Sequence, residues 1–312
     1  MLDLLIAVVI DFIIGDPPTW PHPIRFMGNT IAFEDKLVRK VAKSDRGLVI
    51  GGFFIVIVNM LLAFGITYII LKLLKPYTYV YHIVNIYIIY TCIAARCLRD
   101  EAVNILKAFD KGIEEARYKL SFIVGRETKH LDEQEIVRAT VETVAENTAD
   151  GVIAPLFFAM IGGAPAATLY KMINTMDSML GYMNEKYRHI GFFPAKTDDL
   201  FNFIPARLTG IFMNISGIFK YDVLSGFKVM IRDRKNHKSP NCAYPEGAVA
   251  GLLGVQLGGD NVYFGQIMKK PRIGDARRIL SRDDIKRTVE VMFRTEVLFV
   301  VIYSVICLII SK

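Results

Sequence analysis

The sequence predicts an all-α, polytopic membrane protein with interrupted or re-entrant helices and cytoplasmic helical loops. The 312-residue chain is 53% hydrophobic and has a mean hydropathy of +0.35, which makes it more apolar than most soluble enzymes of this size. The apolar residues are concentrated in blocks, and the clearest block exceeds the roughly 20 residues needed to cross a hydrocarbon core. Glycine and proline interrupt other blocks. We therefore expect residues 1–312 to form a single multi-pass membrane domain that contains a cytoplasmic helical segment at 96–150.

The apolar blocks predict the membrane helices in chain order. Residues 1–18 carry Asp3 and Asp11 and no basic start, so they predict a short tilted or interfacial helix rather than a signal peptide. Residues 48–74 contain no charge before Lys72 and predict a spanning helix. Residues 79–95 begin with aromatic side chains, as an interfacial belt does, and predict a second span. Residues 297–310 predict a further span.

Basic residues predict the orientation of the chain in the membrane. Lysine and arginine gather at 16–47 and at 96–150, whereas only Lys72 and Lys75 lie between the two long apolar blocks. The positive-inside rule then places both basic segments in the cytoplasm, which predicts a cell-membrane protein with a cytoplasmic active site. Because the basic residues flank apolar spans and form no groove interleaved with aromatic residues, the expected partner is the lipid bilayer and not nucleic acid.

Common catalytic and cofactor motifs are absent from the sequence. The four cysteines form no C-x-x-C pair, so they predict reduced, packed thiols and neither a zinc site nor a redox motif. The sequence contains neither common nucleotide-binding fingerprint, and it also lacks H-E-x-x-H and G-x-S-x-G. The chemistry must therefore come from scattered acids, bases and amides near the glycine- and proline-rich turns.

Residues 131–150, "LDEQEIVRATVETVAENTAD", predict an amphipathic helix with an acidic stripe. At the helical period its three central valines fall within about 60° of one another, and three glutamates on the opposite side fall within about 40°. Those glutamates are Glu135, Glu142 and Glu146. A stripe of this kind is either a solvated helix face or a site for a cation, and both interpretations are open at this point.

The Asp-Gly pair at Asp150 and Gly151 is expected to end this helix, with Asp150 capping the next one. Glu146 would then lie in the last helical turn, where the helix dipole disfavours an anion. A bound cation, either Mg²⁺ or a substrate ammonium, would relieve that repulsion. We therefore favour Glu142, Glu146 and Asp150 as a cation site.

Residues 152–169 are apolar but contain two glycines and two prolines, which predict a broken or re-entrant helix packed against other protein. Residues 198–219 form another interrupted apolar stretch. If both stretches cross the membrane fully, the loop between them is external; if both are re-entrant, that loop is cytoplasmic. Further on, the spacing of Gly247, Gly251 and Gly254 predicts close contact between helices.

A proline-rich loop near the start of the chain forms a second candidate site wall. The segment "DFIIGDPPTWPHPIRFMGNTI" holds Asp16, His22 and Arg25 in a chain that proline makes rigid and extended. The alternative is an interfacial Trp20 anchor with a hydrogen-bonded histidine. No second histidine lies at metal-ligand spacing, so a histidine-based metal site is not expected.

Two further groups are candidates for chemistry. Lys171, Asn174 and Ser178 share one helical face with Asp177 at its margin, and a Lys171–Asp177 pair near membrane depth would indicate function. The alternative is a helix that has already left the membrane. Glu246 begins a glycine-rich helix, where an acid could equally serve the helix dipole.

Six ordered stretches carry a resemblance to a known family. They are "GDPPTWPHPIRFMG", "ATVETVAENTADGVIAPLFF", "GGAPAATLYKMINTMDSMLGY", "DDLFNFIPARLTG", "SPNCAYPEGAVAGLLGVQLGG" and "GDARR". Through them the chain resembles the membrane cobalamin-biosynthesis family of adenosylcobinamide-phosphate synthases, and the resemblance extends from about Asp11 to about Arg278.

The resemblance implies an ATP-dependent acid–amine ligase of corrinoid biosynthesis. Such an enzyme joins the side-chain f carboxylate of adenosylcobyric acid to (R)-1-amino-2-propanol O-phosphate, or to aminopropanol, and gives adenosylcobinamide phosphate. It also implies a bilayer location and contact with other corrinoid-pathway membrane enzymes. A non-catalytic membrane sensor or regulator and a corrinoid transporter remain the alternatives.

Forming the amide requires an activated carboxylate, and we hypothesise an acyl-phosphate route in which Mg²⁺ and basic side chains neutralise the phosphates. The expected metal ligands are Glu142, Glu146, Asp150, Asp198 and Asp199. The expected catalytic residues, among them the base that takes the amine proton, are Asp16, His22, Glu142, Glu146, Asp177 and Glu246. The expected substrate-binding residues, with cations for the phosphates, are Arg25, Asn147, Lys171, Asn174, Ser178 and Arg207.

Overall fold

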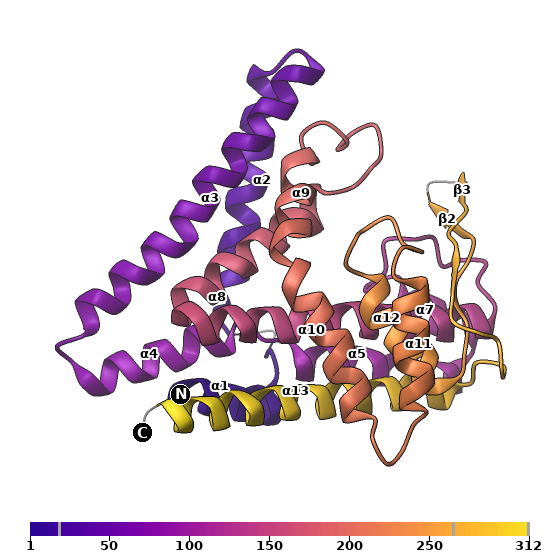
Figure 1. Cartoon of the computed structure of the whole chain (residues 1–312). Helices are drawn as coiled ribbons and strands as arrows, with labels where there is room; N and C mark the ends of the chain where they lie inside the picture. Colours follow the sequence, from indigo (N-terminus) through magenta and orange to yellow (C-terminus); the bar gives the residue numbers. More distant parts are fainter. Residues whose placement is uncertain (18–19, 264–265, 311–312) are drawn as a thin grey trace. The chain divides into compact units, whose positions relative to one another are not determined.

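The computed structural model describes residues 1–17, 20–263 and 266–310, and it is almost entirely helical (Figure 1). Pro18 and Thr19 of the predicted proline-rich loop lie outside the described residues. Contacts divide the chain into two units, each built from two stretches of sequence. Unit 1 comprises residues 1–94 and 154–202, and unit 2 comprises residues 95–153 and 203–312. The all-α membrane architecture expected from the sequence is confirmed.

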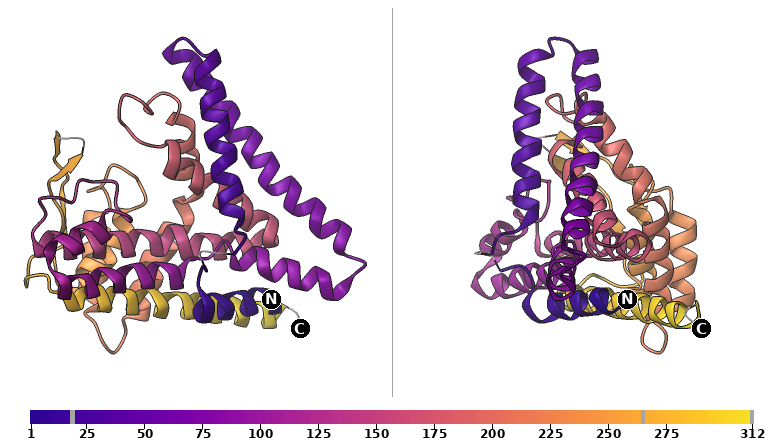
Figure 2. Two further views of the ribbon diagram at one scale, coloured as in Figure 1. Left: turned by 180° about the vertical axis from the view of Figure 1, so that it is seen from behind. Right: turned by 90° about the vertical axis from the view of Figure 1, so that its left-hand side faces the viewer.

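The described residues of unit 1 form six helices, namely α1 (Leu2–Ile14), α2 (Pro23–Val41), α3 (Asp45–Leu74), α4 (Thr78–Tyr90), α8 (Ala154–Leu180) and α9 (Phe192–Phe201). The starts of two helices follow from local chemistry: Pro23 occupies the first position of α2, and the Ser44 hydroxyl accepts a hydrogen bond from Gly47 N–H at the start of α3. Figure 2 shows α2 and α3 running side by side from the turn that joins them.

Four helices in the described part of the chain are long and apolar enough to cross a membrane, and they cover Asp45–Leu74, Thr78–Lys111, Glu133–Leu180 and Arg282–Ile310. The first and last confirm the spans predicted at 48–74 and 297–310. The predicted span at 79–95 is less regular, because α4 ends at Tyr90 and a short turn precedes the next helix.

Helix α8 is interrupted, as its glycines and prolines predicted. Gly162 and Gly163 leave helical geometry, and Gly163 adopts a φ of +67°, which is costly for residues other than glycine. Pro165 follows directly inside the resumed helix, where it cannot donate a backbone hydrogen bond. Most of α8 is buried against protein, which is the setting that a broken membrane helix requires.

Unit 2 surrounds helix α7 (Glu133–Asn147). Its other helical elements are α5 (Ala95–Ala108), η1 (Phe109–Lys111), α6 (Ile113–Leu120), η2 (Thr148–Ile153), α10 (Phe203–Ser216), α11 (Val223–Asp233), α12 (Ala243–Leu253) and α13 (Arg282–Ile310). Two short antiparallel pairs join β1 (Leu257–Gly258) to β4 (Arg272–Ile273) and β2 (Asn261–Tyr263) to β3 (Gln266–Met268). No local pattern in the sequence predicts these strands.

Helix α7 differs from the prediction in two ways. Its polar face is not solvated, because every residue from Ile136 to Ala145 is buried and helices α5, α6, α12 and α13 pack around it. Nor does the helix end at the Asp-Gly pair. A π-helical turn over Thr148–Ile153 carries the helical backbone onward. The expectation that Asp150 caps a new helix is therefore wrong. Glu146 does lie in the last turn of α7, but the π turn continues the helical backbone beyond it.

The glycine spacing on α12 is explained by contact with α11. A β-carbon at Gly251 would lie 2.5 Å from Ser225 O, and one at Gly247 would lie 2.9 Å from Met230 Cα. Such distances require glycine, so the predicted close packing is confirmed at these two positions. Gly254 has a different reason: it ends α12 in the left-handed conformation, with a φ of 65°.

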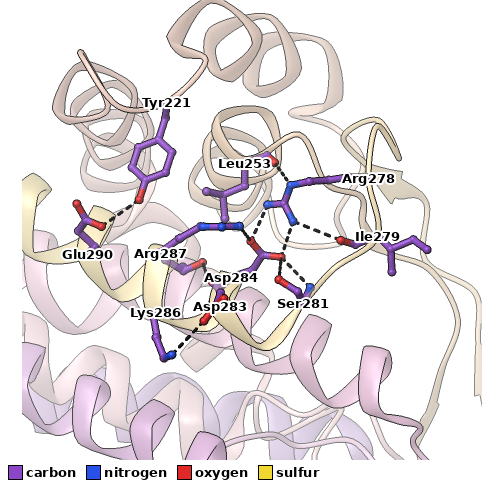
Figure 3. A network of polar contacts seen from close by, with 11 residues as sticks. Tyr221, Leu253, Arg278, Ile279, Ser281, Asp283, Asp284, Lys286, Arg287 and Glu290 are labelled. Carbon is purple, nitrogen blue, oxygen red and sulfur yellow. Dashed lines mark hydrogen bonds and ion pairs between the residues drawn. The ribbon is translucent and has the colours of Figure 1, made fainter.

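The beginning of α13 is anchored by a buried carboxylate (Figure 3). Arg278 donates to both oxygens of Asp284 at 2.7 and 2.6 Å, and Ser281 N–H and Arg287 donate to the same group at 2.8 Å each. This bidentate geometry satisfies a charge that burial alone would penalise. The "GDARR" stretch thus supplies a structural clamp through its last arginine.

Candidate functional site

The candidate site lies in unit 2, where α7 brings Glu142 to the β1–β4 pair. Glu142 accepts a hydrogen bond from Arg126 and another from Gly258 N–H at 2.8 Å, and Arg138 Nε lies 3.8 Å from its Oε1. The Glu142 side chain is 8% exposed and that of Arg126 is 7% exposed. Glu142 is therefore a buried ion-pair partner as well as a candidate for chemistry.

Glu146 lies one turn further along α7 and meets the start of α12. The Cys242 thiol donates to Glu146 Oε1 at 3.0 Å. Burial raises the pKa of that thiol well above its usual value, and the negative charges of Glu146, Asp150 and Glu246 raise it further. Cys242 is thus a neutral thiol surrounded by acids, and Glu146 and Asp150 belong to one group.

Glu246 completes this group from the first turn of α12. Its side chain is buried, and burial together with the charges of Glu142 and Glu146 holds its pKa well above the usual range. Glu246 therefore keeps its proton to a higher pH than an ordinary glutamate does, whereas Glu142 is paired with arginine. Acids held in different protonation states within one site are typical of proton-transfer chemistry.

A small hollow of about 10 Å³ lies among Glu142, Glu246, His237 and Lys270. Ser239 N–H donates to His237 Nδ1 at 3.0 Å, and His237 Nε2 lies 3.4 Å from Lys270 Nζ. Burial lowers the pKa of His237, so the ring is neutral at neutral pH. Because Nδ1 accepts a hydrogen bond, Nε2 carries the ring proton and can donate it.

A larger hollow of about 480 Å³ is rich in arginine. One of the arginines that line it, Arg138, also lies beside Glu142. The arginines of this hollow are Arg138, Arg272, Arg277 and Arg278. Arg277 and Arg278 pair with Asp222 and Asp284, and Arg272 donates to Gly258 O at 3.0 Å. The acid group and the basic hollow therefore adjoin through Arg138, Glu142 and Gly258.

The two remaining unit 2 predictions lie on neighbouring elements. Asn147 donates to Thr143 O at 2.9 Å within α7. Arg207 lies over the rings of Phe203 and Tyr244 and donates to Asn241 Oδ1 at 3.1 Å. Arg207 thus holds the loop that leads into α12, which is the helix that carries Glu246.

In unit 1 the proline-rich loop and α8 carry other predicted residues. Asp16 Oδ1 lies 3.5 Å from His22 Nε2, and Arg25 is exposed at the start of α2. Lys171 is buried and lines an apolar pocket. Lys171 and Asp177 lie six residues apart on α8, which separates their side chains by about 120° around the helix, so the two do not face each other. A catalytic role for Asp177 stays a prediction.

The rest of the unit 1 predictions join α8 to α9. Asp198 accepts hydrogen bonds from Asn174 at 3.4 Å and from Asn202 at 3.0 Å, and Asp199 pairs with Lys196. Ser178 donates to the Asn174 carbonyl at 2.8 Å. The amide contacts give Asp198 a role in packing α9 on α8, and its role as a metal ligand stays a prediction.

Comparison with known proteins identifies the family. A family model described as CobD/Cbib protein matches residues 4–292. The chain belongs to the CobD/CbiB family. It is 53% identical over 314 residues to the cobalamin biosynthesis protein CobD of Clostridium acetobutylicum, with 100% of both chains covered.

Two enterobacterial relatives agree with this assignment. The identity is 46% over 296 residues to CobD of Klebsiella pneumoniae, covering 94% of this chain and 93% of the relative. It is 46% over 291 residues to CbiB of Salmonella typhimurium, covering 92% and 91%. Both are described as cobalamin biosynthesis proteins, so this CobD/CbiB chain functions in cobalamin biosynthesis. No solved structure matches the chain.

Reasoning from the sequence missed four members of this candidate site, namely His237, Lys270, Arg126 and Arg138. His237 lies in a basic stretch, "RDRKNHKSPNC", directly before the helix of Glu246. That position was the one available signal, since a histidine followed closely by an acid-bearing helix can reach the same site. Arg126 gave no signal, because its partner is 16 residues away beyond an irregular loop.

The protonated Glu246 predicts a pH dependence of stability. Because its pKa is raised in the folded state, the folded protein holds a proton that the unfolded chain loses above its ordinary pKa of 4.5. Its stabilising contribution is complete below that value and is lost as pH rises toward the folded pKa. We expect the melting temperature of wild type to fall more steeply with rising pH above 4.5 than that of Glu246→Gln. Parallel pH curves for the two proteins in detergent would contradict this assignment.

Proposed function

We propose that this protein forms the amide bond of adenosylcobinamide phosphate. In this proposal it joins the side-chain f carboxylate of adenosylcobyric acid to (R)-1-amino-2-propanol O-phosphate, or to free aminopropanol, at the expense of ATP. The proposal is supported by the cobalamin-biosynthesis relatives and by one feature of the site. That feature is the group of Glu142, Glu146 and protonated Glu246 beside a hollow lined by arginines.

The chemistry requires two steps with opposite demands. First, a carboxylate oxygen of the corrinoid attacks the terminal phosphorus of ATP, the bond to the ADP oxygen breaks, and an acyl phosphate forms. The amine nitrogen then attacks the acyl carbon, the phosphate leaves, and the nitrogen loses a proton. The first step needs fixed positive charge, and the second needs a proton acceptor near the amine.

The residues of unit 2 offer groups for both demands. Arg138 and Arg272 line the basic hollow, where guanidinium groups can hold phosphate oxygens bidentately. His237 Nε2–H and Lys270 Nζ are donors for a developing oxyanion. Glu146, half-buried and held by Cys242, is the proposed acceptor of the amine proton or the partner of the substrate ammonium.

The residues also fit Mg²⁺ in the way that this ion usually binds beside nucleotides. In the part of the chain that the structure describes, no three His, Cys, Asp or Glu side chains converge to hold a metal by themselves. Mg²⁺ commonly takes one or two carboxylates and completes its shell with water and phosphate oxygens. Asp150, near Cys242, is the carboxylate that we propose for it. Bound there, Mg²⁺ would neutralise phosphate charge.

The proposed reaction is tested by reconstituting the purified protein with adenosylcobyric acid, ATP, Mg²⁺ and either amine. We expect a product with the mass of the amide and one nucleotide product per amide, and the ADP or AMP formed identifies the activation step. Transport of corrinoid into vesicles without amide formation would instead support a transporter. Failure both to form product and to rescue a corrinoid-auxotroph strain would support a regulator.

A further inference from the structure

Unit 1 contains a pocket that the proposed ligation does not use. It has a volume of about 430 Å³, within the range of about 300–1,000 Å³ that is typical of ligand sites. Helices α2, α3, α4 and α8 all contribute to its lining. Among the described residues that line it, Lys171 alone carries a charge, and the others are apolar or carry a hydroxyl or thiol group.

Lys171 is the polar feature of this pocket. The residue is only 8% exposed, and no described residue accepts a hydrogen bond from its side chain or forms an ion pair with it. Lys171 and Asp16 both exert an electrostatic effect on the Cys92 thiol. The Asp16 carboxylate, however, faces His22, with 3.5 Å between Asp16 Oδ1 and His22 Nε2. A buried ammonium without a partner is costly and calls for an anion.

The mouth of the pocket is apolar and lies along a membrane-spanning helix. Leu62, Ile66 and Ile70 follow one another at four-residue spacing on α3, line the pocket and are 39%, 54% and 39% exposed. Phe26 of α2 is 70% exposed beside them. An occupant that enters past these side chains must have an apolar body, and hydrocarbon of the bilayer already surrounds a helix of this kind.

We propose that this pocket binds an anionic phospholipid, with an acyl chain along the α3 stripe and the phosphate group on Lys171. A soluble phosphate ester shares the phosphate chemistry but has no apolar body to fill the lining. The lipid satisfies both observations, the unpaired buried cation and the apolar mouth. This inference does not rest on the proposed ligation, since it concerns a pocket wholly within unit 1.

The test uses the full-length protein, purified in detergent, stripped of lipid and titrated with phosphatidylglycerol or phosphatidylcholine while bound lipid is counted by native mass spectrometry. We expect one phosphatidylglycerol to be retained preferentially. Lys171→Gln should weaken its retention about tenfold or more, because a charge-assisted hydrogen bond to phosphate is lost. Lys171→Arg should keep the preference. Ala63→Phe, which fills the pocket beneath the stripe, should weaken retention of either lipid.

Lys75→Gln is the matched control, since Lys75 is an exposed lysine of the same unit outside the pocket, and it should behave as wild type. Equal retention of both lipids by wild type, or unchanged retention by Lys171→Gln, would overturn the proposal. Displacement of the lipid by millimolar inorganic phosphate or aminopropanol phosphate would overturn it in favour of a site for soluble anions. Because the readout is bound lipid, the result is independent of whether the protein ligates an amide.

Discussion

Glu146→Gln should lower the rate of amide formation about a hundredfold or more and leave the melting temperature close to that of wild type. Proton transfer by a positioned side chain contributes about 10²–10⁴-fold to a rate, and glutamine can neither accept the amine proton nor pair with an ammonium. Glu146 is half-buried, and it accepts a hydrogen bond from the Cys242 thiol. The amide oxygen of glutamine can accept the same hydrogen bond. The substitution therefore removes charge without opening the core.

The measurement is a single-turnover assay on reconstituted protein at saturating ATP, with membrane insertion and thermal unfolding followed in parallel. Glu115→Gln serves as the control, because Glu115 is a partly exposed acid of α6 in the same unit and lies outside the site. Full activity of Glu146→Gln would remove Glu146 from the proposed mechanism. A large fall in melting temperature would show that its role is structural.

Glu142→Gln should destabilise unit 2 by about 3–5 kcal/mol, because removing one partner of a buried ion pair leaves the other charge uncompensated. Arg126 would keep its guanidinium in a site where its side chain is only 7% exposed, and Arg138 would lose the same neighbour. Activity should fall as well, but as a consequence of lost structure. The readout is thermal unfolding in detergent together with the fraction of protein that resists protease.

A double-mutant cycle separates the ion pair from other effects of this substitution. Glu142→Gln combined with Arg126→Met removes both charges at once, and the double variant should recover most of the stability that Glu142→Gln alone loses. Additive losses in the double variant would mean that the two side chains do not depend on each other. A neutral effect of Glu142→Gln would contradict the arrangement of the site.

The parts of this fold that the sequence predicts are those decided by local composition. The uncharged stretch before Lys72 specifies α3, and Gly162, Gly163 and Pro165 specify the interruption of α8, because hydropathy and backbone geometry act within a few residues. The short β1–β4 pair carries no such local signal. Its register depends on Gly258 meeting Arg272 across the segment that contains β2 and β3.

The candidate site could be predicted only in part, since its members come from distant segments. The helical period placed Glu142 and Glu146 on one face of α7. It could not show which other helices cover that face, because it considers α7 alone. Burial of that face depends on α12 and α13, which lie roughly 100 residues or more further along the chain. The pairing of Glu142 with Arg126 and the protonation of Glu246 follow from those contacts, which no local pattern contains.

The π-helical turn at Thr148–Ile153 also bears on how this sequence can change in length. A π turn holds one residue more than an α turn, so it is a place where a helix absorbs an inserted or deleted residue without breaking. Deleting one residue there would restore an ordinary α turn and leave the residues on either side of it close to the helix faces that they now occupy. Homologous sequences can thus vary by one residue at this point and keep both the helices and the faces that those helices bury.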